Sequence, residues 1–308
     1  MSPRSDVGAG ALALPRGIIP SMNTPFLQDG SIDIEGIRRS TDAVIEAGIA
    51  GMLILAVAGE TGSLSLDEKR LIAGSFLRTA AARVPVIVGC SSAHQQDRLV
   101  LAAMARELQA DAMLCQVPIG LRGEALLAQM SELAQIGPAL LMVQDLEFGG
   151  PGLPLQDILL LHRRLPAFQG LKIETALPGP KYTAVLQATH GALHVSGGWA
   201  AAQMMEALHR GVHAFIPTAM DRIYVEIFRR FQAGDLAGAR TLHEQLTPVL
   251  AFSNQHIDVS IRFFKSLRQR EGLFQTALCR PGVSELDAHQ TREMEIALAR
   301  VLALQQSL

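Results

Sequence analysis

The chain has 308 residues, 49% of them hydrophobic, and a formal net charge of −2 at pH 7. This length suits one large domain or two modest ones with a sizeable core. The near balance of charge excludes the strongly basic surface typical of nucleic-acid binding. The longest apolar run, residues 49–59, is too short and too rich in glycine to cross a membrane. We therefore expect neither nucleic acid nor a membrane as a partner.

Residues 1–15 lack a charged start followed by a continuous hydrophobic stretch, so we interpret them as a flexible N-terminal tail, not a signal peptide. The three cysteines, Cys90, Cys115 and Cys279, are scattered and lack the spacing of a metal site. Buried free thiols in a reducing cytoplasm are the expectation.

Eight short runs along the chain are apolar throughout and do not alternate with polar residues. This pattern is typical of parallel strands that are covered on both faces. The runs are 17–26, 51–59, 84–90, 111–117, 138–144, 170–174, 192–198 and 213–219.

Amphipathic stretches separate these runs and predict helices, which makes the connected strands parallel. Residues 34–48 show the helical period, and Ser65 and Glu68 have the spacing of a capping box. Eight such units predict an α/β fold, a (β/α)8 TIM barrel over residues 16–220. An open doubly wound sheet is the main alternative, but no G-x-G-x-x-G follows the first run. Residues 221–308 predict a C-terminal helical region of about four helices.

Lys172 lies near the end of the sixth run, "GLKIE". Active sites of such barrels form at the carboxyl ends of the strands. Burying an ammonium group is costly unless it is paired or has a chemical task. Removal from water favours the neutral amine, which can attack a carbonyl and form a Schiff base. The alternative is a lysine whose head reaches solvent or a carboxylate at the barrel rim.

Collinear segments over nearly the whole chain resemble the dihydrodipicolinate synthase / N-acetylneuraminate lyase family of class I aldolases. The segments are "GIIPSMNTPFLQDGSID", "AGETGSLSLDEK", "VPVIVGCSS", "GLKIE", "VSGG" and "GDLAGARTLHEQLTPV". The resemblance implies a (β/α)8 barrel with C-terminal helices and a homotetramer, with a dimer as the alternative. It also implies that Lys172 binds a 2-keto acid such as pyruvate as an imine.

The chain departs from this family where the keto acid's carboxylate is held. Val57 and Ala58 stand where family members usually have two hydroxyl residues. The backbone N–H groups of Gly59 and Glu60 are then the expected anion cradle. Gly197 and Ile216, from the seventh and eighth runs, complete the expected substrate-binding set.

Two further departures concern the chemistry. Gln144, or Met142 in the other register, replaces the family's catalytic tyrosine at the end of the fifth strand, and a glutamine cannot shuttle a proton at neutral pH. The only tyrosines, Tyr182 and Tyr224, fall in predicted helices. Residues 147–152 also lack the arginine that binds the second substrate in lysine-pathway enzymes.

Strand alternation places Glu174 on the same face as Lys172, about 6.6 Å away. Glu174 is therefore the candidate general acid/base, or simply the ion partner of Lys172. Asp145 and Glu60 compete for the proton-handling role, although Glu60 is also interpreted as structural.

Three other residues attract attention near the strand ends. Trp199 is either a pocket wall or a core residue, and His194 and His213 are interpreted as core or loop histidines. With no clustered histidines or carboxylates, we expect no metal and no cofactor.

The sequence thus predicts a cytoplasmic Schiff-base-forming lyase, either an aldolase or a hydro-lyase. It acts on a 2-keto acid, or on a sugar acid that yields one, and not in the lysine-pathway reaction. The alternative is a catalytically impaired 2-keto acid binding or regulatory protein on the same barrel.

Overall fold

The structure is a computed structural model that describes residues 13–308, apart from the side chains of Trp199 and Ala200. Most of the predicted N-terminal tail, residues 1–12, lies outside the described residues. Leu14, from the last part of that segment, is buried at the barrel and does not belong to a loose tail.

Eight parallel strands form one sheet in the order β1-β8-β7-β6-β5-β4-β3-β2. The Met22 N–H donates to the Leu53 carbonyl at 2.8 Å, and the Leu53 N–H donates to the Pro20 carbonyl at 2.9 Å. This contact joins the chain after β1 to β2, so the (β/α)8 barrel is confirmed and the open sheet is excluded. The strands are β1 (Gly17–Ile18), β2 (Met52–Ile54), β3 (Val86–Gly89), β4 (Ala112–Gln116), β5 (Leu141–Glu147), β6 (Phe168–Thr175), β7 (His194–Gly197) and β8 (Ala214–Phe215).

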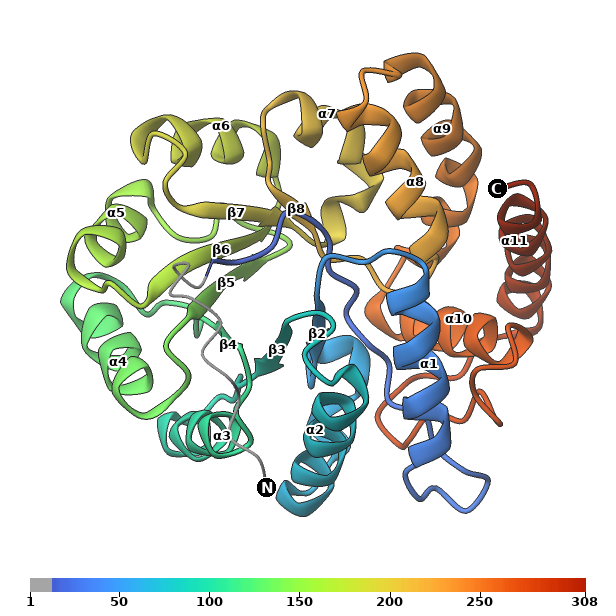
Figure 1. Ribbon diagram of the computed structural model, residues 1–308, viewed down its shortest axis with the longest axis horizontal. Helices are drawn as coiled ribbons and strands as arrows, with labels where there is room; N and C mark the ends of the chain where they lie inside the picture. The colour runs from blue at the N-terminus through green and yellow to red at the C-terminus, as the bar shows by residue number, and fades with distance from the viewer. Residues whose placement is uncertain (1–12) are drawn as a thin grey trace.

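Helices surround the strands (Figure 1), and one follows each strand along the chain. They are α1 (Ile34–Glu46), α2 (Leu66–Ala80), α3 (Gln95–Glu107), α4 (Gly123–Ile136), α5 (Leu155–Arg164), α6 (Pro178–Ala188), α7 (Met204–His209) and α8 (Asp221–Gln232). The predicted helical region begins with α8, which packs against β1 as the eighth helix of the barrel. The C-terminal extension then consists of α9 (Leu236–Ser253), α10 (Ile257–Arg270) and α11 (Ala288–Gln306), on one side of the barrel.

Inside the barrel, alternate residues of the strands pack together in a cluster that includes Ile19, Leu53, Ile87, Leu114 and Met142. Leu14 belongs to the same cluster and lies against Gly170 near the start of β6. A methyl group on Gly170 would lie 2.3 Å from the Leu14 Cδ1 atom. Glycine at this position leaves room for Leu14 at the amino-terminal end of the barrel, opposite the ends where a site is expected.

The segment after β2 departs from the predicted strand. The run was expected to stay extended to residue 59, but Val57–Gly59 and Thr61–Ser63 form two 3-10 turns joined by Glu60, whose φ is 56°. The chain then enters α2 through the predicted capping box. Ser65 Oγ accepts from the Glu68 N–H at 3.2 Å, and Glu68 Oε2 accepts from the Ser65 N–H at 2.9 Å. The turns place Val57 and Ala58 at the carboxyl end of the barrel.

All three cysteines are free, and Cys90 and Cys115 are buried as expected. Burial raises the pKa of Cys115 to about 12. Cys279 differs because it is only partly buried, although burial still raises its pKa to about 11.

Candidate active site

Lys172 and Glu174 project from the same face of β6 and form a buried ion pair, with 3.0 Å between Nζ and Oε2. Their side chains are only 6% and 7% exposed. Gln144 of β5 lies in register with Lys172, and its amide donates to the same Glu174 oxygen at 2.5 Å. The carboxylate is thus held between a cation and an amide at the carboxyl end of the barrel.

This group lines a cavity of about 140 Å³. Val57, Ala58 and Ile216 line the same cavity. The volume is well below the roughly 300–1,000 Å³ of sites for drug-sized ligands. It suits a ligand of a few heavy atoms placed against Lys172. Six of the nine residues selected from the sequence therefore meet in one place: Gln144, Lys172, Glu174, Val57, Ala58 and Ile216.

The backbone amides of Gly59 and Glu60 have other partners. The Gly59 N–H donates to the Ala56 carbonyl at 2.9 Å, and the Glu60 N–H donates to the Val57 carbonyl at 3.0 Å. Both bonds belong to the first 3-10 turn, so these two groups are not free to cradle an anion. This contradicts the expected anion cradle, which assumed an open loop.

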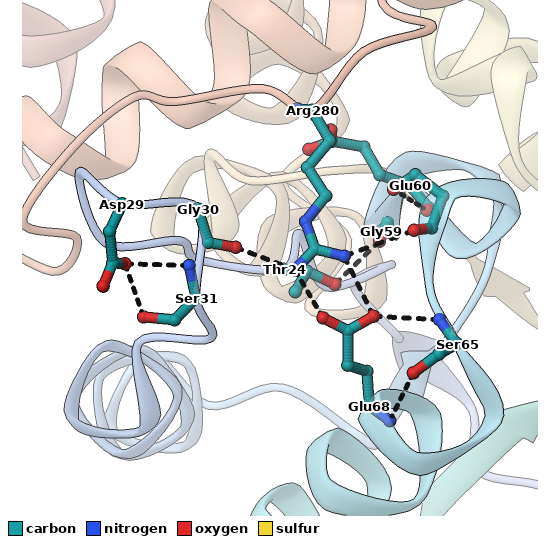
Figure 2. Close-up of polar contacts among 10 residues, drawn as sticks. Thr24, Asp29, Gly30, Ser31, Gly59, Glu60, Ser65, Glu68 and Arg280 are labelled. Atoms are coloured by element: carbon teal, nitrogen blue, oxygen red, sulfur yellow. Dashed lines mark hydrogen bonds and ion pairs between the residues drawn. The ribbon is translucent and has the colours of Figure 1, made fainter.

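Glu60 points away from the cavity into a buried network. Its Oε1 accepts from Lys265 Nζ at 2.5 Å, and its Oε2 accepts from the Arg280 N–H at 2.7 Å. Figure 2 shows the Arg280 guanidinium reaching on to Glu68 and to the Gly30 carbonyl. Burial lowers the pKa of Lys265 from its ordinary value, while the Glu60 carboxylate opposes that shift. The geometry supports the structural interpretation of Glu60, because its carboxylate ties the β2 turn to the C-terminal segment.

Gly197 does not line the cavity either. Its carbonyl accepts from the Ile216 N–H at 2.7 Å, in the pairing of β7 with β8. The next residue, Gly198, lines the cavity instead. Gly197 was the residue expected from the sequence, but β7 continues through it, and its neighbour reaches the cavity instead.

Asp145 and Met142 are also separated from the cavity. Asp145 faces outward from β5, pairs with Lys181 of α6, and accepts from the Leu153 N–H at 2.8 Å. Burial raises the pKa of Asp145. Met142 is fully buried in the barrel interior, so Gln144 is the β5 residue that reaches Glu174.

The two histidines lie near the amino-terminal end of the barrel. His194 Nε2 is 2.9 Å from the Pro15 carbonyl oxygen, and the His194 and His213 rings are 5.3 Å apart. Burial lowers the pKa of His194 to about 4 and also lowers the pKa of His213. Their surroundings suit core histidines. The side chain of Trp199 lies outside the described residues.

The sequence predicts that Tyr224 lies in a helix and gives it no role in the site. Tyr224 does lie in α8. Its side chain nevertheless lines the cavity, together with Ser21, Thr218 and Ser260. Burial raises the pKa of Tyr224, so its hydroxyl stays protonated and can donate a hydrogen bond. Helical periodicity identifies a buried tyrosine, but only the packing of α8 against the barrel places Tyr224 beside a cavity.

In the described part of the chain, no group of three or more histidines, cysteines or carboxylates is placed to hold a metal ion. Among the described helices, none is both long and apolar enough to cross a membrane.

Fold and cavity define a (β/α)8 barrel with a lysine-containing site at the carboxyl ends of its strands. Residues 14–301 match the model of the Dihydrodipicolinate synthetase family, and the chain belongs to that family. It is a divergent member of a family of lyases, since its similarity to individual relatives is low.

A 4-hydroxy-tetrahydrodipicolinate synthase from Neisseria meningitidis is 25% identical over 237 residues, covering 76% of this chain and 81% of that protein. Two solved structures share the fold. The 4-hydroxy-tetrahydrodipicolinate synthase from Methylacidiphilum fumariolicum superposes with a TM-score of 0.83 at 20% identity, covering 95% of this chain and 97% of that one. The sialic acid aldolase of Ruminococcus gnavus superposes with a TM-score of 0.84 at 19% identity, covering 95% and 98%.

Proposed function

We propose that the chain is a Schiff-base-forming lyase that acts on a 2-keto acid, or on a sugar acid that yields one. The observation that carries the proposal is the buried Lys172–Glu174 pair, 3.0 Å apart, at the wall of a small cavity. A buried amine beside a carboxylate has the two groups that imine formation needs, a nucleophile and a proton carrier.

The pair supplies both groups by moving one proton. Transfer from the Lys172 ammonium to Glu174 gives a neutral amine and a carboxylic acid. The amine attacks the C2 carbonyl, and the acid donates its proton to the oxygen that leaves as water. The protonated imine then accepts the electron pair released when the C3–C4 bond breaks in an aldol cleavage, or when C3 loses a proton in a dehydration. Hydrolysis of the imine returns the lysine.

Gln144 fixes the carboxylate during this cycle. Its amide donates to Glu174 Oε2 but cannot carry a proton at neutral pH. Glu174 is therefore the proposed general acid/base in place of a tyrosine. The lysine-pathway reaction does not suit the chain, because residues 147–152 contain no arginine for a second carboxylate.

The second candidate is a 2-keto acid binding or regulatory protein without turnover, and the glutamine at position 144 favours it. Borohydride trapping with a panel of 2-keto acids separates the possibilities. The chain has four lysines, Lys69, Lys172, Lys181 and Lys265, so mapping the modified peptide is decisive. We expect trapping on Lys172, abolished by Lys172→Ala and retained by Lys69→Ala.

Glu174→Gln tests turnover separately from imine formation. It leaves the amine in place, so Lys172 should still be trapped, although more slowly, while turnover falls about 10²–10⁴-fold. Trapping on Lys181 or Lys265 would overturn the assignment of Lys172, and trapping without any product would favour the binding protein.

A homotetramer or dimer and a cytoplasmic location remain part of the proposal, and the three free cysteines support a reducing compartment.

A further inference from the structure

A second, larger cavity lies directly outside the first. It has a volume of about 690 Å³ and lies between the carboxyl end of β6 and the helices α9 and α10. The two cavities share five lining residues: Phe148, Glu174, Leu250, Asn254 and Ile257. They therefore form one continuous space, with Glu174 at the junction and Lys172 in the inner part.

The charges of this space are unusual for a site that would bind two anionic groups. Among the described residues that line the two cavities, Lys172 is the only lysine or arginine, and it is paired with Glu174. His256 at the outer cavity has a 65% exposed side chain 3.7 Å from Asp258. A second carboxylate or phosphate on a ligand would meet the Glu174 carboxylate at the junction without a compensating cation, which is unfavourable.

Apart from Glu174 and His256, the described residues that line the outer cavity are apolar or neutral. Phe148 is 50% exposed and lines both cavities at their junction, where it adds an aromatic side chain to the wall. Leu250, Ala251 and Ile257 add aliphatic surface, and Thr247 and Asn254 add neutral hydrogen-bonding groups. Such walls favour an uncharged group with an apolar body.

We propose that the substrate of this site is a 2-keto acid whose distal part is uncharged and largely apolar, and that this part occupies the outer cavity. The inference rests on the proposed function, because Lys172 must hold the keto acid end. In the cleavage direction, the C3–C4 bond breaks and its electron pair moves to C3, toward the imine. The C4 hydroxyl proton passes to Glu174 at the junction, and C4 leaves as the carbonyl of an uncharged aldehyde. The products are pyruvate and an apolar aldehyde.

The test compares pyruvate, 2-oxo-4-phenylbutanoate and 2-oxoadipate as probes in borohydride trapping. The readout is the concentration of each acid that gives half-maximal labelling of Lys172, measured by mass spectrometry. For the intact chain, we expect half-maximal labelling by the phenyl acid at a concentration about 10-fold below those of pyruvate and 2-oxoadipate, since the phenyl group buries apolar surface.

Ala251→Arg places a cation at the mouth of the outer cavity, at an exposed position of α9. It should raise the half-maximal concentration of the phenyl acid about 5-fold and lower that of 2-oxoadipate by a similar factor, while pyruvate stays unchanged. Ala237→Arg is the matched control, because Ala237 is exposed on the same helix but lines neither cavity.

The outcomes separate the two proposals. If pyruvate labels Lys172 but 2-oxoadipate is captured as readily as the phenyl acid, the uncharged distal group is wrong and the proposed function stands. The same conclusion follows if Ala251→Arg and Ala237→Arg behave alike. If none of the three acids labels Lys172, the proposed function fails and the inference fails with it.

Discussion

A methyl group on Gly198 would lie only 2.0 Å from Glu174 Oε1 and 2.5 Å from Lys172 Cε. Both side chains are held in place, since Glu174 accepts from Gln144 and pairs with Lys172. They cannot move aside without breaking the group that lines the cavity.

Gly198→Ala should therefore damage the site more than the fold. We expect borohydride trapping of pyruvate to fall at least about 10-fold, the usual result of misplacing reacting groups, while thermal unfolding shows a folded protein. The control is Gly62→Ala, because the space around the added carbon is open. Gly191→Ala is less suitable, because the φ of Gly191 is positive. Normal trapping by Gly198→Ala would show that the pair tolerates displacement.

Replacing the apolar side chains of the β2 turn should strengthen keto acid binding. Val57 and Ala58 line the cavity without offering a side-chain donor, and each hydrogen bond to a charged group is worth about 1.5–3 kcal/mol. Val57→Thr with Ala58→Thr should lower the pyruvate concentration needed for half-maximal trapping. Val57→Ile, which adds no hydroxyl, should not. An unchanged value in a folded double variant would mean that the carboxylate binds elsewhere in the cavity.

The Tyr224 hydroxyl should contribute to substrate binding or turnover. Tyr224 lines the cavity, and burial raises the pKa of its hydroxyl, which is therefore protonated at neutral pH. Tyr224→Phe should lower kcat/KM about 10-fold or more, the range expected for a hydrogen bond to a charged ligand. Tyr182→Phe is the matched control, because that buried hydroxyl donates to the Ile173 carbonyl at 3.4 Å and does not line the cavity. If the two variants have equal effects, Tyr224 has only a structural role in the core, and its hydroxyl does not contribute to binding or turnover.

The strands were predictable because most of their residues are apolar and buried on both faces. The contacts within the site were harder to predict from the sequence, since they depend on packing between distant segments. Lys172 and Glu174 are two residues apart, so strand alternation alone placed them on one face. The partner of Glu60 is Lys265, 205 positions away, and no local pattern reveals such a pair. Tyr224 was missed for the same reason, because a helical period gives burial but not the cavity that a side chain reaches.

The Lys265–Glu60 pair should be important for stability. The two side chains are 0% and 2% exposed, so removing one partner leaves the other charge buried and uncompensated. Lys265→Ala should cost about 3–5 kcal/mol of unfolding free energy, measured by denaturant titration. Arg164→Ala, which breaks the exposed pair with Glu124, should cost less than about 1 kcal/mol. Similar losses for both variants would contradict the burial argument.

Stability should fall in mild acid because of His194. Its folded pKa of about 4 lies below the ordinary value of 6.5, so the unfolded chain binds the proton more readily. The stabilisation is present above pH 6.5 and is lost as the pH falls toward 4, a change of about 3 kcal/mol. His194→Gln keeps an N–H for the Pro15 carbonyl and does not titrate, so its unfolding free energy should depend less on pH in this window. His289→Gln, at an exposed position, should retain the slope of the intact chain.

The hydrogen bond between Glu60 and Arg280 also affects when the β2 turn can be completed during protein synthesis. Proteins are synthesised from the amino terminus, and the β2 turn emerges 220 residues before the backbone N–H that completes its hydrogen bonding. Lys265, which neutralises the same carboxylate, emerges 205 residues after Glu60. A nascent barrel that has already formed all eight strands still carries an unpaired Glu60. The final shape of this turn is therefore reached only after Lys265 and Arg280 have left the ribosome.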